Sequence, residues 1–359
     1  MKLGFGFYRH QLDRDHMRFA RQCGATHAVV HLVDYFRGGG AANAAGDQPT
    51  GTKTEGWGVA GGTDDLWTVE ELREIKSVLA EEGLEWAAIE NFDPGHWHDV
   101  LLDGPKKAEQ LETVKTLIRR VGEAGIPMIG YNFSLAGVSS RVHSDQVRGK
   151  ATVLGLDGPN ETPVPRGMVW NMVYDADAPE GVMPPCTHEE LWERLEDFLR
   201  AVLPVAEEAG VSLAAHPDDP PLPTLRGTPR LVYQPWMYDR LLDIESGPHN
   251  RLELCLGTVA EMSEGDVYET VERYAARDRI GYIHFRNVKG KVPRYRETFV
   301  DDGDIDMRRV LRILKRHDFQ GVLIPDHTPQ MTCPAPWHAG MAYAMGWMRA
   351  AMDEMEDGA

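Results

Sequence analysis

The chain has 359 residues, and 56 acidic against 38 basic side chains give it a formal net charge of −18. Such an acidic protein repels phosphate backbones and anionic lipid surfaces, so nucleic acids and membranes are not expected partners. No apolar run is long enough to span a bilayer and the first residues lack the pattern of a signal peptide, which predicts a soluble cytoplasmic protein. The four cysteines are few and far apart, which is typical of reduced thiols rather than of a disulfide framework.

Short apolar, β-branched segments alternate with amphipathic segments along the chain. Predicted strands occupy residues 3–8, 26–33, 84–91, 126–133, 211–217, 251–258, 280–288 and 321–328. Predicted helices include residues 68–83, 110–125, 191–210 and 307–318, and several end near a glycine of the type that terminates helices. Eight strand–helix units indicate an α/β fold of the (β/α)8 TIM-barrel type, formed by residues 1–359 as a single domain.

Two segments interrupt this alternation, at about residues 36–63 and 134–187. Each follows the C-terminal end of a predicted strand, and in a barrel that face carries the loops of the active site. We therefore interpret both segments as loop insertions that serve as lids or as contacts between subunits, and we expect a homo-oligomer.

Four potential metal ligands each lie near the C-terminal end of a different predicted strand. They are His216, Cys255, His284 and Asp326, separated by 39, 29 and 42 residues, each about one strand–helix unit. A single buried cysteine or histidine is more often a structural residue, but four in register on successive strands favour a metal site. Two imidazoles, a thiolate and a carboxylate suit a first-row transition ion better than calcium or magnesium. His96 and His98 have similar spacing but no partners in register, so we expect them in a loop or in contact with substrate.

Several sequence blocks resemble one known family. They are HPDDPP (216–221), LRGTPRLV (225–232), CLGT (255–258), IHFRNV (283–288), GDIDM (303–307) and PDHTPQM (325–331). Together they resemble the mannonate dehydratase family, which belongs with the xylose-isomerase-like TIM barrels. The resemblance is specific over residues 211–331 and looser in the first half, and residues 36–63 depart from it.

This resemblance implies a lyase that removes water from a small sugar acid such as D-mannonate and gives a 2-keto-3-deoxy acid. It implies one divalent ion, usually Mn²⁺ with Fe²⁺, Co²⁺ or Mg²⁺ as alternatives, held by the residues matching the four ligands above. It also assigns an acid/base role to His327. The family's partner tyrosine is replaced here by His338, within PWHAGMAYAMG (336–346), and Tyr343 lies more than one helical turn farther on.

Dehydration next to a carboxylate needs a cation, a base and an acid. We therefore expect His327 and His338 to be the acid/base pair. Arg286 either clamps the substrate carboxylate or forms a salt bridge with an acid of the barrel rim. Asn132 and Glu90 either bind substrate hydroxyl groups or only fix loops.

Two other functions remain open from the sequence. One is a metal-dependent sugar isomerase, epimerase or lyase that acts on a different polyol, because the same barrel and ion can move a proton without loss of water. The other is a catalytically degenerate metal-binding barrel, which the replaced tyrosine favours and the intact His327 beside Asp326 disfavours. Asp218 and Asp219 either hold the loop of His216 or cap a turn.

Overall fold

Eight parallel strands close into a barrel in the order β1-β16-β13-β12-β9-β4-β3-β2, as shown by a computed structural model that describes residues 1–38, 56–62 and 66–357. This confirms the predicted (β/α)8 barrel, and each predicted strand overlaps an observed one. The barrel strands are β1 (Lys2–Phe7), β2 (His27–Val30), β3 (Glu85–Glu90), β4 (Met128–Tyr131), β9 (Ser212–Ala215), β12 (Asn250–Cys255), β13 (Ile280–His284) and β16 (Val322–Ile324).

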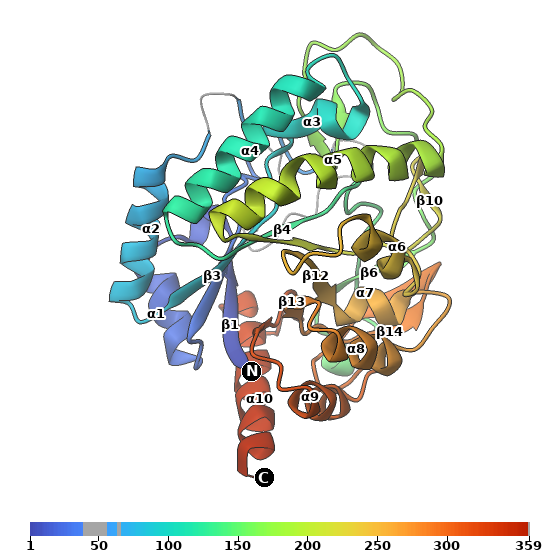
Figure 1. Ribbon diagram of the computed structural model, residues 1–359. Coiled ribbons are helices and arrows are strands. Elements are labelled where there is room, and N and C mark those ends of the chain that lie inside the picture. Colours follow the sequence, from blue (N-terminus) through green and yellow to red (C-terminus); the bar gives the residue numbers. More distant parts are fainter. Residues whose placement is uncertain (39–55, 63–65, 358–359) are drawn as a thin grey trace.

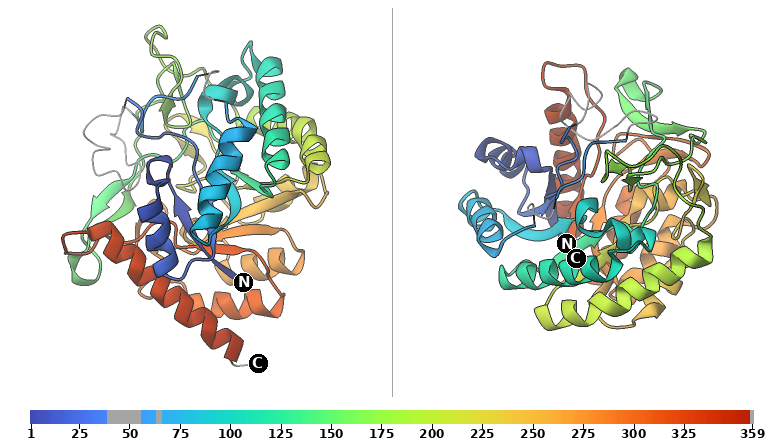
Figure 2. Two further views of the ribbon diagram at one scale, coloured as in Figure 1. Left: turned by 90° about the vertical axis from the view of Figure 1, so that its left-hand side faces the viewer. Right: turned by 90° about the horizontal axis from the view of Figure 1, so that it is seen from above.

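Helices surround the barrel, as the view from above shows (Figure 2). They are α1 (Arg14–Gln22), α2 (Val69–Glu81), α3 (Pro94–Leu102), α4 (Lys107–Glu123), α5 (His188–Ala209), α6 (Met237–Ile244), α7 (Leu256–Glu261), α8 (Val267–Ala276), α9 (Met307–Arg316) and α10 (Pro336–Asp357). Gly83, Gly125 and Gly210 follow α2, α4 and α5 with φ angles of 78°, 71° and 68°, so these glycines do end helices in the left-handed region. No helix in the described part of the chain is long and apolar enough to cross a bilayer. All four cysteines are free.

The apolar core has two parts because side chains on a strand alternate between its two faces. One large cluster lies between the strands and the helices and includes Leu252 and Leu254 of β12 and Phe198 of α5. A small cluster fills the inside of the barrel. Its members are Val29, Ala88, Ala214, Tyr282, Val322 and Ile324.

The predicted insertion at 134–187 lies between β4 and α5 and carries four short strands. These are β5 (Val142–Ser144), β6 (Val153–Asp157), β7 (Met168–Val169) and β8 (Met172–Val173). Strands β5 and β6 join the hairpin of β14 (Val288–Lys291) and β15 (Arg294–Glu297) in one sheet, ordered β14-β15-β6-β5. In Figure 1 this green segment lies at the end of the barrel opposite the two chain ends. The insertion and the hairpin after β13 therefore lie together over the C-terminal ends of the strands.

The other predicted insertion, residues 36–63, falls largely on residues 39–55 and 63, outside the described part of the chain. Of its described residues, Trp57 donates a backbone hydrogen bond to the carbonyl oxygen of Asn171 at 2.8 Å. The predicted loop around His96 and His98 is wrong, because both residues belong to helix α3.

The narrow interior of the barrel makes a specific prediction at Gly130 of β4. A Cβ atom there would overlap the hydroxyl of Tyr282 and the carboxylate of Glu253, both of which are buried and cannot retreat into solvent. We expect Gly130→Ala to lower the free energy of unfolding by about 1–3 kcal/mol, as overpacking does, measured by urea denaturation.

Gly346→Ala in α10 is the matched control. A Cβ at Gly346 meets no atom within 4 Å, and alanine in a helix is more stable than glycine by about 0.5–1 kcal/mol. Equal free energies of unfolding in the two variants would contradict the conclusion that side chains fill the barrel interior at Gly130.

Candidate metal centre and active site

The polar residues at the mouth of the barrel continue the inward face of its strands. Each lies two positions beyond a side chain of the small interior cluster, and therefore points the same way. The pairs are Val29 and His31, Ala88 and Glu90, Ala214 and His216, and Tyr282 and His284. Cys255 likewise follows Glu253, with the outward-facing Leu254 between them. Along these strands, the inward-facing side chains thus change from apolar to polar from one inward position to the next.

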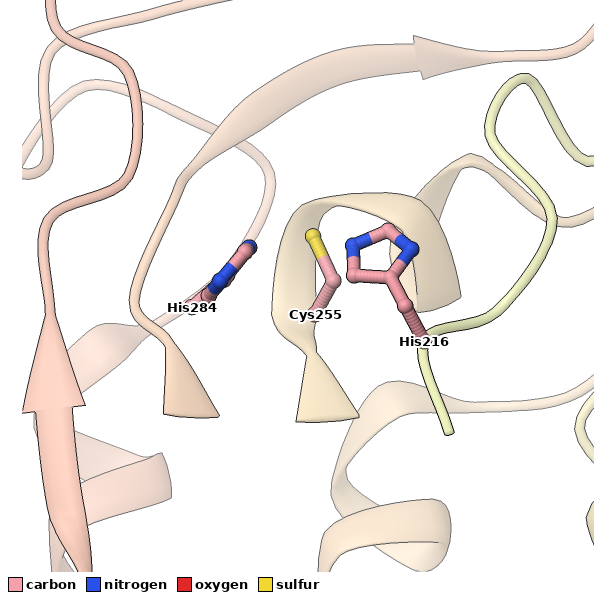
Figure 3. A group of neighbouring side chains, drawn as sticks. All are labelled: His216, Cys255 and His284. Carbon is pink, nitrogen blue, oxygen red and sulfur yellow. The ribbon is translucent and has the colours of Figure 1, made fainter. Parts of the chain in front are cut away.

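Three of the four predicted metal ligands form a tight group. His216, Cys255 and His284 each offer a donor atom, and these atoms lie within 4.8 Å of one another. Figure 3 shows the sulfur of Cys255 between the two imidazole rings. Nδ1 of His216 is 2.6 Å from the carbonyl oxygen of Pro217, which leaves Nε2 for the group. Nδ1 of His284 is buried and has no hydrogen-bond partner among the described residues.

The electrostatics of the group favour a thiolate. Burial alone would raise the pKa of the Cys255 thiol, but the Arg286 guanidinium, with Nη2 3.4 Å from the sulfur, and the two imidazoles hold that pKa well below its ordinary value. Burial likewise opposes the charged form of His216, yet the hydrogen bond with Cys255 raises the pKa of this imidazole to about 9. Thiolate is the form of cysteine that binds metal ions.

Asp326, the fourth predicted ligand, lies beside this group. Its Oδ2 is 3.5 Å from Nδ1 of His284 and 3.5 Å from Nε of Arg286. Its φ angle of 60° is in the left-handed region, which few residues other than glycine and the Asn/Asp pair adopt. This turn after β16 bends the chain at the strand end, and it brings the carboxylate to the metal-ligand group.

These residues face a polar cavity at the mouth of the barrel. Its lining includes Tyr8, His31, Glu90, Asn132, Arg141, His216, His284, Asp326 and His327. Asn132 and Glu90, the predicted substrate contacts, both line this cavity. Asn132 also donates a hydrogen bond to the carbonyl oxygen of Pro217 at 3.2 Å and accepts one from Nε1 of Trp170 at 3.0 Å, so it fixes two loops as well.

Arg286 takes the second of its two predicted roles. Its guanidinium is buried, with the residue only 2% exposed, and does not line the cavity. It lies 2.7 Å from Glu297, 3.0 Å from Asp219 and 3.4 Å from Glu261. Because these carboxylates occupy its donors, Arg286 forms internal salt bridges, and the guanidinium that reaches the cavity is that of Arg141.

His327 lines the cavity and has a carboxylate on each side. Its Nδ1 is 3.0 Å from Oε1 of Glu297, and its Nε2 is 3.4 Å from Oδ1 of Asp326. Burial would raise the pKa of Glu297, but His327 and Arg286 lower it to about 2. Glu297 is therefore ionised and able to accept the Nδ1 proton of His327.

The structure does not bring His338 to His327. His338 is exposed in the first turn of α10, where its ring packs 4.8 Å from that of Phe19 and 5.9 Å from that of His16, both of α1. The reason is that α10 begins at Pro336 and places this turn against the outer helix α1. Tyr343 is also remote from the lining of the cavity, since its hydroxyl donates to Asp301 at 2.8 Å.

Sequence reasoning missed several polar residues of this site. Glu253 could have been found, because it precedes Cys255 by two positions on one strand and so shares its face. His31 lies near the end of the second predicted strand, residues 26–33, so its place at the mouth of the barrel could also have been predicted. Arg141 and Glu297 carried none, because they belong to the insertion and to a hairpin whose pairing is set only in the folded chain.

Comparisons with known proteins show the family of this chain. The family model described as D-mannonate dehydratase (UxuA) matches residues 53–150 and 184–351. A mannonate dehydratase of Streptococcus pneumoniae (strain 70585) is 35% identical over 274 residues, 73% of this chain and 74% of that protein. One of Oceanobacillus iheyensis is 30% identical over 279 residues, 73% and 78% of the two chains.

Solved structures agree as well. The crystal structure of a mannonate dehydratase from Streptococcus suis serotype 2 superposes with a TM-score of 0.75 at 26% identity, covering 100% of this chain and 95% of that one. A xylose isomerase domain protein from Planctomyces limnophilus, at 12% identity and a TM-score of 0.56 over 99% of both chains, shares the fold. The chain thus belongs to the D-mannonate dehydratase family, a family of hydro-lyases, and is one of its enzymes.

Proposed function

We propose that this protein removes water from D-mannonate or a closely related aldonate and releases the 2-keto-3-deoxy acid. The observation that carries this proposal is the shared cavity: His216 and His284 of the metal-ligand group line it together with His327 and Arg141. A chain of a dehydratase family that keeps a cation site, a proton carrier and a carboxylate-binding group in one cavity has the parts that the reaction needs.

We propose further that His216, Cys255, His284 and Asp326 hold one divalent ion, with Mn²⁺ as the first choice. The buried Nδ1 of His284 without a hydrogen-bond partner and the lowered pKa of Cys255 suit metal ligands. Nitrogen, sulfur and carboxylate donors together fit a transition ion. When bound, the ion supplies positive charge that stabilises the negative charge developing on the substrate.

His327 is the proposed proton carrier, and Nε2 is the atom involved. The ionised Glu297 can accept a proton on Nδ1, and Nε2, which lies 3.4 Å from Oδ1 of Asp326, is then the ring nitrogen that takes or gives a proton in the cavity. Arg141 is the proposed contact for the substrate carboxylate, since a guanidinium matches a carboxylate with two parallel hydrogen bonds. Its Nη2 lies 2.6 Å from Asp219, which holds the side chain in place from behind.

Tyr8 is the proposed partner of His327 in place of His338. It follows β1 and lines the main cavity and also the smaller one beneath α10, and His327 lines both as well. The other candidate, His31, has Nδ1 3.0 Å from the hydroxyl of Tyr35 and Nε2 3.5 Å from Glu90. His31 lies between Tyr35 and Glu90, so we propose the phenol of Tyr8, which lines both cavities together with His327, as the acid for the departing hydroxyl group.

The reaction itself is tested with a panel of aldonic acids and the matching neutral alditols. We expect a 2-keto-3-deoxy acid from D-mannonate or a near epimer and none from the alditols, because Arg141 needs a carboxylate to bind. A colour assay for 2-keto-3-deoxy acids measures the product. Isomerised or epimerised sugar without this product would instead establish the alternative of an isomerase.

Arg141→Met extends this test. Losing hydrogen bonds to a charged group should lower kcat/KM for the acid by about tenfold or more. Arg166→Met is the control, because Arg166 is exposed in the same insertion and is remote from the lining of this cavity. An equal loss in both variants would remove Arg141 from the proposed role.

Metal content tests the ligand group. We expect purified protein to carry about one transition ion per chain by elemental mass spectrometry, and we expect Cys255→Ser to lower that occupancy because a serine hydroxyl does not ionise as a thiol does. Cys333→Ser, at an exposed cysteine, should keep the ion. Full occupancy in Cys255→Ser would take Cys255 out of the site.

The partner of His327 is tested by Tyr8→Phe. Removing the hydroxyl should lower kcat by about 10²–10⁴, the usual contribution of an acid/base group, without lowering metal content. Tyr343→Phe, whose hydroxyl bonds Asp301 on the outer surface, should keep near-full activity. Loss of activity in His338→Gln with an active Tyr8→Phe would return the role to His338.

A further inference from the structure

The second ring nitrogen of His284 faces two buried carboxylates. Nε2 lies 3.3 Å from Oε2 of Glu90 and 3.0 Å from Oε1 of Glu253. Glu90, Glu253 and His284 also form a second group that could itself hold a cation, and it shares His284 with the metal-ligand group. Two explanations are therefore available: a second ion, or carboxylates that orient the histidine.

The direction of the ring N–H separates the two carboxylates. Glu90 lies in line with Nε2 and makes a hydrogen bond with it. Glu253 is closer but out of line, and neither of its oxygens has a hydrogen-bond partner among the described residues. Glu90 is therefore the acceptor of the Nε2 proton. A neutral imidazole has one protonated nitrogen and one lone pair, so this hydrogen bond leaves the lone pair on Nδ1.

His216 shows the same arrangement with the two nitrogens exchanged. Its Nδ1 is held by the carbonyl oxygen of Pro217, at 2.6 Å, and its Nε2 is left for the metal-ligand group. No such carbonyl bonds to His284, whose Nε2 instead meets Glu90, which reaches across from β3. The protein thus uses a backbone carbonyl to orient one histidine and a side-chain carboxylate to orient the other.

Glu90 is itself held in place. The residue is 5% exposed, and its second oxygen, Oε1, lies 3.5 Å from Nε2 of His31. Nδ1 of His31 is 3.0 Å from the hydroxyl of Tyr35, which accepts a hydrogen bond from Asn91 at 3.2 Å. This chain of contacts fixes the carboxylate from behind, which is what an orienting group needs.

We infer that Glu90 is a positioning residue: by accepting the Nε2 proton of His284 it fixes the tautomer and the rotation of the ring and presents Nδ1 to the metal ion. This inference rests on the proposed metal site and replaces the earlier expectation that Glu90 binds a substrate hydroxyl. It also explains why Glu90 and Glu253 lie near Nε2 without a second metal ion. An ion on Nε2, in addition to the one on Nδ1, would need His284 to use both nitrogens as ligands.

Two conservative variants test the inference. Glu90→Gln loses the charge but keeps the length and an oxygen that can accept the same N–H, whereas Glu90→Asp keeps the charge but withdraws the oxygen. We expect Glu90→Asp to bind Co²⁺ about 10–100-fold more weakly than the unmodified protein, the usual cost of losing such a partner, and Glu90→Gln to bind it nearly as tightly. Competition with a chromogenic chelator measures the affinity.

The absorption spectrum of bound Co²⁺ is a second measurement. A general loss of protein stability would not change this spectrum. The spectrum of Glu90→Asp should change, because a rotated His284 alters the ligand field, and that of Glu90→Gln should match the unmodified protein. Asp99→Asn is the control: Asp99 is buried in α3 and accepts a hydrogen bond from the backbone of Lys106 at 2.8 Å, remote from the ligands. It should change neither affinity nor spectrum.

Each result has one meaning. If Glu90→Gln loses the ion while Glu90→Asp keeps it, charge rather than orientation matters and the inference fails. Equal, unmodified affinity in both variants also overturns it. About two ions per chain in the unmodified protein, with one lost in either variant, would replace it by a second metal site. No Co²⁺ binding by the unmodified protein would instead overturn the proposed metal site on which the inference rests.

Discussion

Closure of eight parallel strands into a barrel is the constraint on which the site depends. Every second side chain of each strand must point inward, and all strands end at the same face. Val29, Ala88, Tyr282 and their neighbours fill the deeper part of the interior. The next inward-facing residues along the strands therefore lie at the mouth of the barrel. A metal-ligand group drawn from β9, β12, β13 and β16 follows directly from this geometry. Asp326 lies just beyond the end of β16, and the turn there brings its carboxylate to the group.

Four acidic side chains are buried together at the mouth of the barrel. They are Asp219, Glu261, Glu297 and Cys255; burial raises the pKa of Glu261, whereas neighbouring positive charges hold the pKa values of the other three below their ordinary values. Removing such charges from water is costly unless they are paired. Arg286 contacts all three carboxylates and the sulfur, which makes it the internal counter-charge of the site. A guanidinium so thoroughly paired is not available to a substrate.

The insertion after β4 supplies what the barrel strands lack. Its strands β5 and β6 join the hairpin that follows β13, and this shared sheet places both Arg141 and Glu297 next to Nδ1 of His327. The barrel strands therefore carry the candidate metal ligands, while the added sheet brings Arg141 and Glu297 beside His327. Residues 151–183, which contain most of β6–β8, lie outside the match to the family model.

The sequence by itself determined the barrel and the candidate metal ligands, because both are periodic. Alternation of strands and helices predicts the fold, and one ligand per strand–helix unit predicts that His216, Cys255, His284 and Asp326 meet. Only the tertiary structure decided the rest. His338 stands at the place of a family tyrosine in the sequence, yet α10 carries it to the outside, against α1. Arg141, Glu297 and the orienting role of Glu90 depend on pairing between distant segments and on the direction of single hydrogen bonds, which no local spacing encodes.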